Sequence, residues 1–155
     1  MKILFVCLGN ICRSPTVEGV ARTLAAREAP HLPLQFDSAG TADYHVGEPP
    51  DARAQRAALE RGYDLSQLRG RQVKPEDFHH FDLLLAMDED NLANLRRIAP
   101  RGREQRAQMF LAWSEAAGRI DVPDPYYGGR EHFDQVIDLA EQGVRDLLRA
   151  LESEV

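Results

Sequence analysis

Residues 2–15 read KILFVCLGNICRSP, an apolar run that stops at Gly9-Asn10 and gives way to a Ser-Pro pair. The apolar run is typical of a buried strand. Gly9 and Asn10 belong to the residue types that tolerate positive φ, so they suit a tight turn. Ser14 and Pro15 then indicate a helix start, with Ser14 as the N-cap and Pro15 at the first helical position. A strand, a tight turn and a helix are therefore predicted within this one stretch.

Outward from this stretch, apolar runs alternate with helix-periodic segments. The runs predict strands at 2–8, 32–40, 81–88 and 107–113, and the periodic segments predict helices after Ser14, at 49–62, at 88–100 and from Glu131 onward. In the last helix, apolar side chains recur on one face at Phe133, Val136, Ile137, Ala140, Val144, Leu147, Leu148 and Leu151. This alternation predicts an α/β fold, a single domain over residues 1–155 with a four-stranded parallel sheet and helices on both faces. Sites in such sheets lie beyond the carboxyl ends of the strands, which is where Cys7 falls.

Composition narrows the classes of partner. The chain has 155 residues, of which 43% are hydrophobic and 28% charged, and its net charge of -6 argues against a general nucleic-acid binder. An anionic substrate would require a local positive field. The apolar run from Ile3 to Leu8 is too short for a signal peptide, and no stretch approaches a membrane span. The only cysteines, Cys7 and Cys12, define no disulfide framework. We therefore expect a cytoplasmic protein with no nucleic-acid or membrane partner.

The turn between Cys7 and Ser14 predicts an anion site. Successive backbone N–H groups in such a turn point into one concavity, and the dipole of the following helix adds positive potential. These groups would attract a phosphate and stabilise a thiolate at Cys7. Arg13 offers a planar fork for two phosphoryl oxygens, and Ser14 could donate a hydrogen bond to the thiolate. A thiolate below a bound phosphate and a guanidinium beside it suit in-line attack at phosphorus.

Each of these residues also has an alternative interpretation without catalysis. A cysteine at a strand end is more often a small buried hydrophobe than a nucleophile. Cys7 and Cys12 could supply two zinc ligands, but no paired ligand spacing exists among the histidines His31, His45, His79, His80 and His132. The acidic run Asp88, Glu89 and Asp90 suits the capping of a helix better than a metal site. We expect no metal.

Asp124, in the stretch DVPDPYYGG of residues 121–129, is the candidate proton donor for a leaving group. Prolines on both sides hold its backbone rigidly. Taken alone, an aspartate between prolines is more often a turn residue. Tyr126 and Tyr127 beside it favour the functional interpretation, because aromatic walls would suit an aromatic leaving group.

The motif VCLGNICRSP at 6–15, followed far downstream by DPYYG at 124–128, resembles the low-molecular-weight protein tyrosine phosphatases. DSAGT, GEPPDAR and MDEDNL also match at the expected intervals, so the resemblance covers nearly the whole chain. It implies a flavodoxin-like fold of the phosphotyrosine phosphatase I-like type and hydrolysis of phosphotyrosine through a cysteinyl-phosphate. By this resemblance Cys7 is the nucleophile, Arg13 the phosphate clamp and Asp124 the general acid and base.

The resemblance also implies roles for the residues around these three. Asn10 and Ser38 would fix the loop geometry, and Ser14 would assist the thiolate. The remaining residues would bind phosphate or line the substrate cleft: Leu8, Gly9, Ile11, Cys12, Tyr44, Tyr126 and Tyr127. The substrate would be a phosphotyrosyl protein or a small aryl phosphate, with no cofactor or metal. We expect a monomer or weak dimer.

Two further points follow from the resemblance. In the family, the second loop cysteine can form a disulfide with the nucleophile under peroxide, which gives Cys12 a protective role beside the alternative of a buried packing residue. Many members also carry a histidine that helps to hold the loop asparagine. Here that stretch reads DLSQLRGRQV, with Gln67 and Leu68 instead, and Gln67 is the candidate for an equivalent hydrogen bond.

Three alternative functions share this loop. Family members that act on phosphoarginine tend to carry threonine where this chain has Ile11, so Ile11 favours phosphotyrosine. Arsenate reduction generally needs further downstream cysteines, and none follows Cys12. A phospho-residue binding module would have lost the nucleophile or the acid, yet Cys7 and Asp124 are both present.

Overall fold

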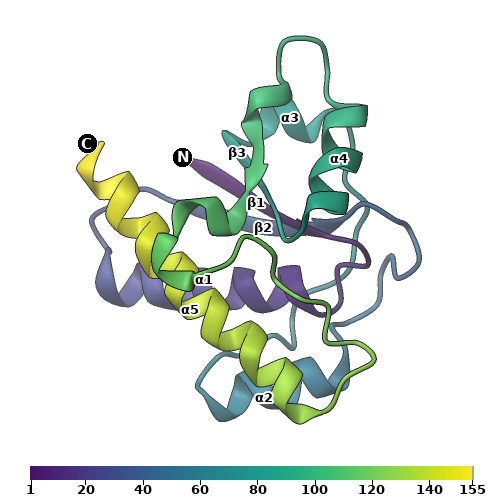
Figure 1. The fold of residues 1–155 in the computed structure, drawn as a ribbon, viewed down its shortest axis with the longest axis vertical. Helices are drawn as coiled ribbons and strands as arrows, with labels where there is room; N and C mark the ends of the chain where they lie inside the picture. Colours follow the sequence, from purple (N-terminus) through teal and green to yellow (C-terminus); the bar gives the residue numbers. More distant parts are fainter. Residues whose placement is uncertain (155) are drawn as a thin grey trace.

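The predicted parallel sheet is confirmed in the computed structural model, which describes residues 1–154. Its strands are β1 (Lys2–Cys7), β2 (Gln35–Gly40), β3 (Leu83–Ala86) and β4 (Ala107–Met109). They pair in the order β2-β1-β3-β4, and every pairing is parallel (Figure 1). The chain passes from β1 to β2 on one side of β1 and then crosses from β2 to β3 on the other side. The carboxyl end of β1 therefore lies at the switch point where such sheets place ligands.

One face of the sheet is covered by α1 (Arg13–Glu28) and α5 (Arg130–Ser153), and α2 (Ala52–Glu60) packs against these two helices. In Figure 1, α5 runs diagonally from the lower part of the molecule to the C-terminus at the upper left. The larger hydrophobic core fills this layer and includes Ile3 and Phe5, alternate residues of β1. Successive strand side chains point to opposite faces, so every second residue of β1 is directed into this core.

The other face is covered by α3 (Asp77–His80) and α4 (Glu89–Ile98). A second hydrophobic core lies here and includes the intervening β1 residues Leu4 and Val6 together with Leu95 of α4. Because β1 is buried on both faces, its sequence is a continuous apolar run rather than an alternating one. The prediction of helices on both faces is confirmed.

The carboxyl-terminal helix is also confirmed. All the apolar positions traced in the sequence are buried along α5, at Phe133, Val136, Ile137, Ala140, Val144, Leu147, Leu148 and Leu151. Gly62, predicted to stop the helix at 49–62, follows the end of α2 with a φ of 93°. Within residues 1–154, no helix combines the length and the apolar composition that crossing a bilayer requires.

The fourth strand is shorter than predicted. The run 107–113 pairs with β3 over three residues and then continues as a short 3₁₀ helix, Phe110–Trp113. The Phe110 side chain turns into the core and lies against Gly143 of α5. Its ring centroid is 5.7 Å from that of Phe5, and the two rings pack edge to face. Packing of this buried ring overrides the extended conformation that the apolar run predicts.

The predicted start of the first helix is two residues too late. Helix α1 begins at Arg13, with Cys12 in the N-cap position and no side-chain cap. Ser14 lies inside the first turn because its hydroxyl contacts Cys7 and Asn10 instead of capping the helix. Pro15 still costs no hydrogen bond, since the first four N–H groups of a helix have no partner within it.

Candidate active site

The segment from Cys7 to Ser14, hereafter the 7–14 loop, connects β1 directly to α1. It rests on the end of β2, where Thr41 N–H donates to Cys7 O at 2.9 Å and Ala42 N–H donates to Leu8 O at 3.0 Å. Gly40 makes this contact possible, because a Cβ at this position would lie 2.7 Å from Leu8 O. The neighbouring strand therefore holds the loop at the edge of the sheet.

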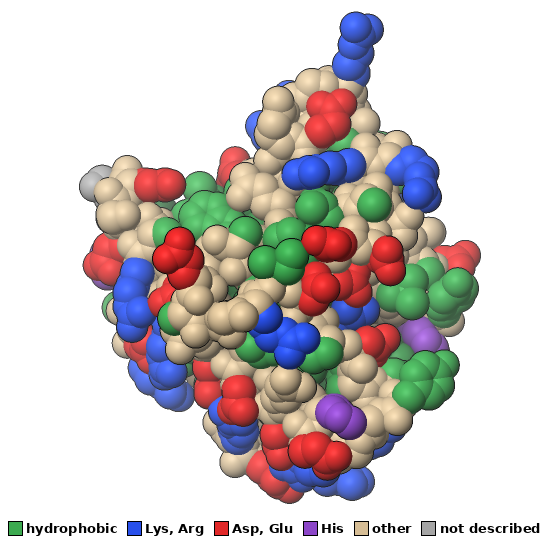
Figure 2. Space-filling view, in the orientation of Figure 1, with side chains coloured by type: hydrophobic (Ala, Val, Ile, Leu, Met, Phe, Trp, Pro, Cys, Tyr) green, Lys and Arg blue, Asp and Glu red, His purple; other side chains and the backbone are tan. Residues whose placement is uncertain are grey.

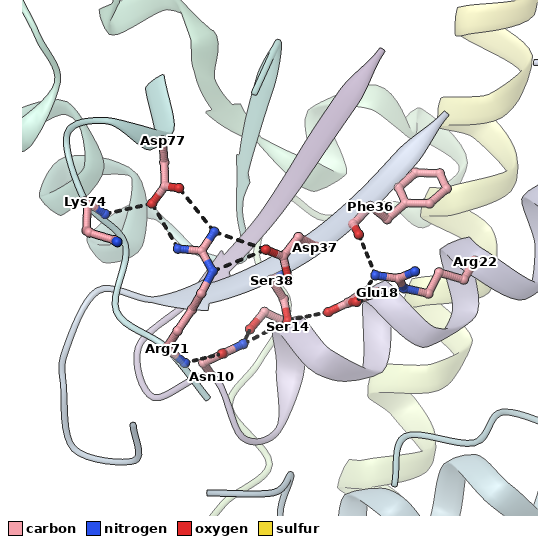
Figure 3. Close-up of polar contacts among 10 residues, drawn as sticks. All are labelled: Asn10, Ser14, Glu18, Arg22, Phe36, Asp37, Ser38, Arg71, Lys74 and Asp77. Atoms are coloured by element: carbon pink, nitrogen blue, oxygen red, sulfur yellow. Dashed lines mark hydrogen bonds and ion pairs between the residues drawn. The ribbon is translucent and has the colours of Figure 1, made fainter. Parts of the chain in front are cut away.

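Asn10 fixes the shape of the loop from inside. It is buried and has a φ of 59°, in the left-handed region that asparagine tolerates. Its amide nitrogen donates to Ser14 Oγ at 2.8 Å and to Ser38 Oγ at 3.0 Å, and its Oδ1 accepts from the Arg71 N–H at 3.0 Å (Figure 3). The structure thus brings together the predicted pair Asn10 and Ser38.

Donors also surround the sulfur of Cys7, which is 3% exposed. Ser14 Oγ lies 3.0 Å from Cys7 Sγ, and the Asn10 N–H donates to the same sulfur at 3.3 Å. Since Ser14 Oγ accepts from the Asn10 amide, its own hydrogen is available to Sγ. Both contacts stabilise negative charge on the sulfur.

A chain of hydrogen bonds continues beneath the loop to Glu18, a residue that sequence reasoning missed. Ser38 Oγ donates to Glu18 Oε1 at 2.6 Å, and Arg22 Nε donates to Glu18 Oε2 at 2.8 Å (Figure 3). Burial raises the pKa of the Glu18 carboxyl, against the opposing effect of these two hydrogen bonds. The sequence did carry one signal for Glu18, because it is an acidic residue in a helical turn whose other residues are buried.

Arg71 holds the opposite end of the Asn10 amide and is itself anchored by two carboxylates. Its guanidinium donates to both oxygens of Asp77, at 3.1 and 3.2 Å, and to Asp37 at 3.2 Å. Asp77 also accepts from the backbone N–H of Lys74 at 2.8 Å. This cluster fixes the backbone of residue 71 beneath the loop (Figure 3).

The prediction that Gln67 takes the place of the missing histidine is wrong. Gln67 is exposed, and its side chain donates to the neighbouring Ser66 Oγ at 3.5 Å. Leu68 packs against the larger hydrophobic core. A main-chain donor, the Arg71 N–H, therefore occupies the place beside Asn10.

Arg13 is 4% exposed, and a carboxylate orients it. Its Nη1 donates to Asp88 Oδ2 at 2.6 Å and to Val122 O at 3.2 Å. Burial acts against the charged form, but Cys7 and Asp88 raise the pKa of Arg13 above its usual value. Asp88 also accepts from the Asn91 N–H at the start of α4, which confirms the predicted helix cap. Its contact with Arg13 was not predicted.

A cleft of about 240 Å³ opens above the 7–14 loop. It brings together the predicted residues Cys7, Leu8, Gly9, Ile11, Cys12, Arg13, Tyr44, Asp124, Tyr126 and Tyr127, and adds His45. Asn10, Ser14 and Ser38 are buried beneath it. No signal in the sequence distinguished His45 from the other histidines.

The mouth of this cleft is aromatic and carries a partly exposed carboxylate, that of Asp124. Tyr44 is 70% exposed and Tyr127 is 95% exposed, and Figure 2 shows hydrophobic side chains gathered at the right-hand edge of the molecule. The Asp124 side chain is 46% exposed, and its Oδ2 lies 3.9 Å from Arg13 Nη2. Its Oδ1 accepts from the Tyr126 N–H at 3.1 Å. The mouth thus combines apolar walls with a carboxylate near the guanidinium.

Cys12 is buried, and both cysteines are free thiols. Burial, followed by the nearby Asp51 carboxylate, raises the pKa of the Cys12 thiol above its usual value. Cys12 is therefore held in its neutral form, and its pairing with Cys7 under oxidation stays a prediction. Among residues 1–154, no three His, Cys, Asp or Glu side chains form a metal-ligand set.

Solved structures share this fold closely. The protein tyrosine phosphatase from Entamoeba histolytica superimposes with a TM-score of 0.94 at 38% identity, covering 99% of this chain and 98% of that one. YfkJ from Bacillus subtilis, a low molecular weight protein-tyrosine-phosphatase, is 37% identical over 99% of this chain and 97% of its own. The fold and the site therefore define a hydrolase of the protein tyrosine phosphatase class.

Within this class the assignment is narrower. The model of the low molecular weight phosphotyrosine protein phosphatase family matches residues 2–155. The protein slr0328 of Synechocystis sp., whose name places it in the same family, is 46% identical over 100% of this chain and 99% of its own. The chain belongs to the low molecular weight phosphotyrosine protein phosphatase family.

Proposed function

We propose that this chain hydrolyses phosphotyrosine monoesters through a cysteinyl-phosphate formed on Cys7. The observation that carries the proposal is the convergence of Cys7, Arg13 and Asp124 on one aromatic cleft. A sulfur with two donors faces a charged guanidinium and a carboxylate that reaches solvent. This set supplies a nucleophile, an anion clamp and a proton donor.

In the first step, the Cys7 thiolate attacks phosphorus and a sulfur–phosphorus bond forms. The bond from phosphorus to the tyrosyl oxygen breaks, and its electron pair leaves with that oxygen. Asp124 gives its proton to the departing phenoxide. Arg13 uses Nη1 for Asp88 and Val122, which leaves the Nε–Nη2 edge to bind two phosphoryl oxygens. The backbone N–H groups of the 7–14 loop bind the developing negative charge.

In the second step, water attacks the phosphorus of the cysteinyl-phosphate. Asp124, now ionised, takes a proton from this water, the sulfur–phosphorus bond breaks, and the electron pair returns to sulfur. Ser14 Oγ, 3.0 Å from Cys7 Sγ, stabilises the departing thiolate. Inorganic phosphate is released and the starting state is restored. Because Arg13 and the backbone N–H groups supply the positive charge, the steps require no metal.

The geometry of the cleft favours an aromatic ester over an alkyl one. Cys7 lies at the floor and is 3% exposed, whereas Tyr44 and Tyr127 stand at the mouth. A phenyl ring is long enough to carry a phosphate to the floor, while the short side chain of phosphoserine keeps its peptide backbone too close to the rim. Ile11 adds an apolar contact to the same wall.

The 1–155 domain would work in the reducing cytoplasm, where the two thiols stay free.

Phosphate release from three peptides tests this proposal. We expect turnover of a phosphotyrosyl peptide, with kcat/KM at least about 100-fold above that of the matched phosphoseryl peptide, a difference of about 2.7 kcal/mol. A phosphoarginyl peptide of the same sequence completes the set. Preference for phosphoarginine would keep the mechanism and overturn the assignment of phosphotyrosine. Binding of all three without turnover would make the site a reader of phosphorylated residues.

A separate prediction concerns Arg71. Arg71→Gln removes the guanidinium that Asp77 and Asp37 hold, and so loosens the N–H that binds Asn10. We expect the inhibition constant of inorganic phosphate to rise about threefold to tenfold, the size of one weakened hydrogen bond. Arg69→Gln is the matched control, since Arg69 is exposed and donates to the carbonyls of Ser66 and Leu68. Equal changes in both variants would show that Arg71 does not support the loop specifically.

A further inference from the structure

Arg53 lies at the start of α2 in contact with two aromatic rings. Its guanidinium carbon lies 5.2 Å from the centroid of the Tyr126 ring and 4.8 Å from that of Phe133. Phe133 is a buried residue of α5, so it forms a fixed base, whereas the Tyr126 side chain is 38% exposed and lines the cleft. Arg53 is thus a cationic contact between the core and one wall of the cleft.

Asp51 fixes the orientation of this guanidinium. Arg53 Nε donates to Asp51 Oδ1 at 3.1 Å, and Nη2 donates to Asp51 Oδ2 at 2.9 Å, a two-point contact that sets the plane of the group. The Asp51 N–H in turn donates to Ile11 O at 2.8 Å. The position of Arg53 is therefore tied to the backbone of the 7–14 loop.

Arg53 stands behind the cleft rather than in it. It lines a separate hollow of about 230 Å³ together with Arg56, Gly128, Gly129, Arg130 and Phe133. The cleft above the 7–14 loop is lined by Tyr126, and Arg53 is not among the described residues that line it. A substrate bound in the cleft would therefore meet the Tyr126 ring and not Arg53 itself.

The other aromatic contact of the Tyr126 ring is with Tyr127. The two ring centroids are 5.0 Å apart and the rings pack edge to face, but Tyr127 is 95% exposed and therefore cannot fix the position of the Tyr126 ring. By contrast, the backbone of this segment is held by the hydrogen bond from the Gly128 N–H to Pro125 O at 2.8 Å. Loss of Arg53 should release the Tyr126 ring while leaving the Asp124 backbone in place.

We propose that Arg53 is a positioning residue that determines specificity for aromatic esters, because it holds the Tyr126 ring as a wall against the phenyl ring of the substrate. The inference rests on the proposed phosphotyrosine hydrolysis and adds a residue to it. A wall that is ordered before binding loses little entropy when the substrate ring packs on it. Arg53 contributes to recognition of the ring and not of the phosphate.

Arg53→Met tests this, with Arg56→Met as the matched control on the same helix and the same hollow. Two competitive inhibitors separate ring from phosphate: phenylphosphonate, which carries a ring, and inorganic phosphate, which does not. In Arg53→Met we expect the inhibition constant of phenylphosphonate and the KM of a phosphotyrosyl peptide to rise about fivefold to tenfold, the usual size of a lost cation–π contact. The inhibition constant of inorganic phosphate and kcat should stay within about twofold of the wild type, and Arg56→Met should match the wild type in all four constants.

Asp51→Asn is a second variant that keeps the cap of α2, because asparagine caps helices as well as aspartate. It removes the charged clamp on Arg53 together with a carboxylate charge near the buried Cys12 thiol. We expect a smaller rise in the inhibition constant of phenylphosphonate, and an unchanged inhibition constant of inorganic phosphate. Parallel rises for both inhibitors in either variant, or no change in Arg53→Met, would overturn the proposal. Absence of wild-type turnover on the peptide would instead refute the proposed function, while the ratio of the two inhibition constants would still report on Arg53.

Discussion

Replacing Cys7 by serine should abolish turnover and leave phosphate binding intact. A serine hydroxyl in place of the thiolate is a far weaker nucleophile at neutral pH, and loss of a catalytic nucleophile lowers kcat by about 10⁴-fold or more. The anion site itself remains, because Arg13 stays paired with Asp88 and the backbone N–H groups of the 7–14 loop are unchanged. Binding of inorganic phosphate, measured by titration calorimetry, should be equal or tighter, since a negatively charged sulfur no longer repels it.

Cys12→Ser is the control for this experiment. Cys12 is buried in the same loop and burial raises the pKa of its thiol, so it is not poised as a nucleophile. We expect Cys12→Ser to keep kcat within about tenfold of the wild type. If turnover survives in Cys7→Ser, or disappears in Cys12→Ser alone, then Cys7 is not the nucleophile.

Asp124→Asn should slow phosphoryl transfer according to the leaving group. An amide cannot protonate the departing oxygen, so esters of weakly acidic phenols should lose about 10²- to 10⁴-fold in kcat/KM. Esters of strongly acidic phenols, which leave without a proton, should lose much less. Because kcat/KM reports only the steps up to formation of the cysteinyl-phosphate, a plot of its logarithm against the pKa of the phenol isolates this role.

The matched control is Asp90→Asn. Asp90 is exposed and lines the hollow next to the cleft together with Asp124 and Arg13. Its removal changes the local charge equally but takes away no proton donor, so the plot should stay parallel to that of the wild type. A steeper plot for Asp90→Asn, or equal slowing of all esters in Asp124→Asn, would remove Asp124 as the acid.

The fold and the floor of the site could be predicted because their signals are local. Cys7, Asn10, Arg13 and Ser14 lie within one strand–turn–helix stretch, and residue types with known backbone preferences define its shape. The eight apolar positions of α5 recur with helical spacing, which is why that helix was predicted so closely. Asp124 and its tyrosines were found through their flanking prolines and their resemblance to a family motif.

The supporting residues could not be predicted, because their partners are distant in sequence. Asp88 lies 75 residues from Arg13, and Arg71 lies 61 residues from Asn10, so no local pattern joins them. The Arg71 contact uses a main-chain N–H, which every residue except proline carries. For this reason, comparing side chains pointed to Gln67 and missed the actual donor. The predicted end of β4 is wrong for a similar reason, since the packing of Phe110 against Gly143 is a tertiary contact that no local pattern indicates.

Direct capture of phosphorus on Cys7 is the most decisive measurement for the proposed mechanism. Asp124→Asn, in which attack of water should be slow, is mixed rapidly with an aryl phosphate of a strongly acidic phenol and quenched in acid. We expect a burst of phenol of about one equivalent per chain, and mass spectrometry of the digested protein should place one phosphoryl group on the peptide that contains Cys7. Release of phenol and phosphate at equal rates from the first turnover, with no phosphorus on Cys7, would contradict the cysteinyl-phosphate mechanism.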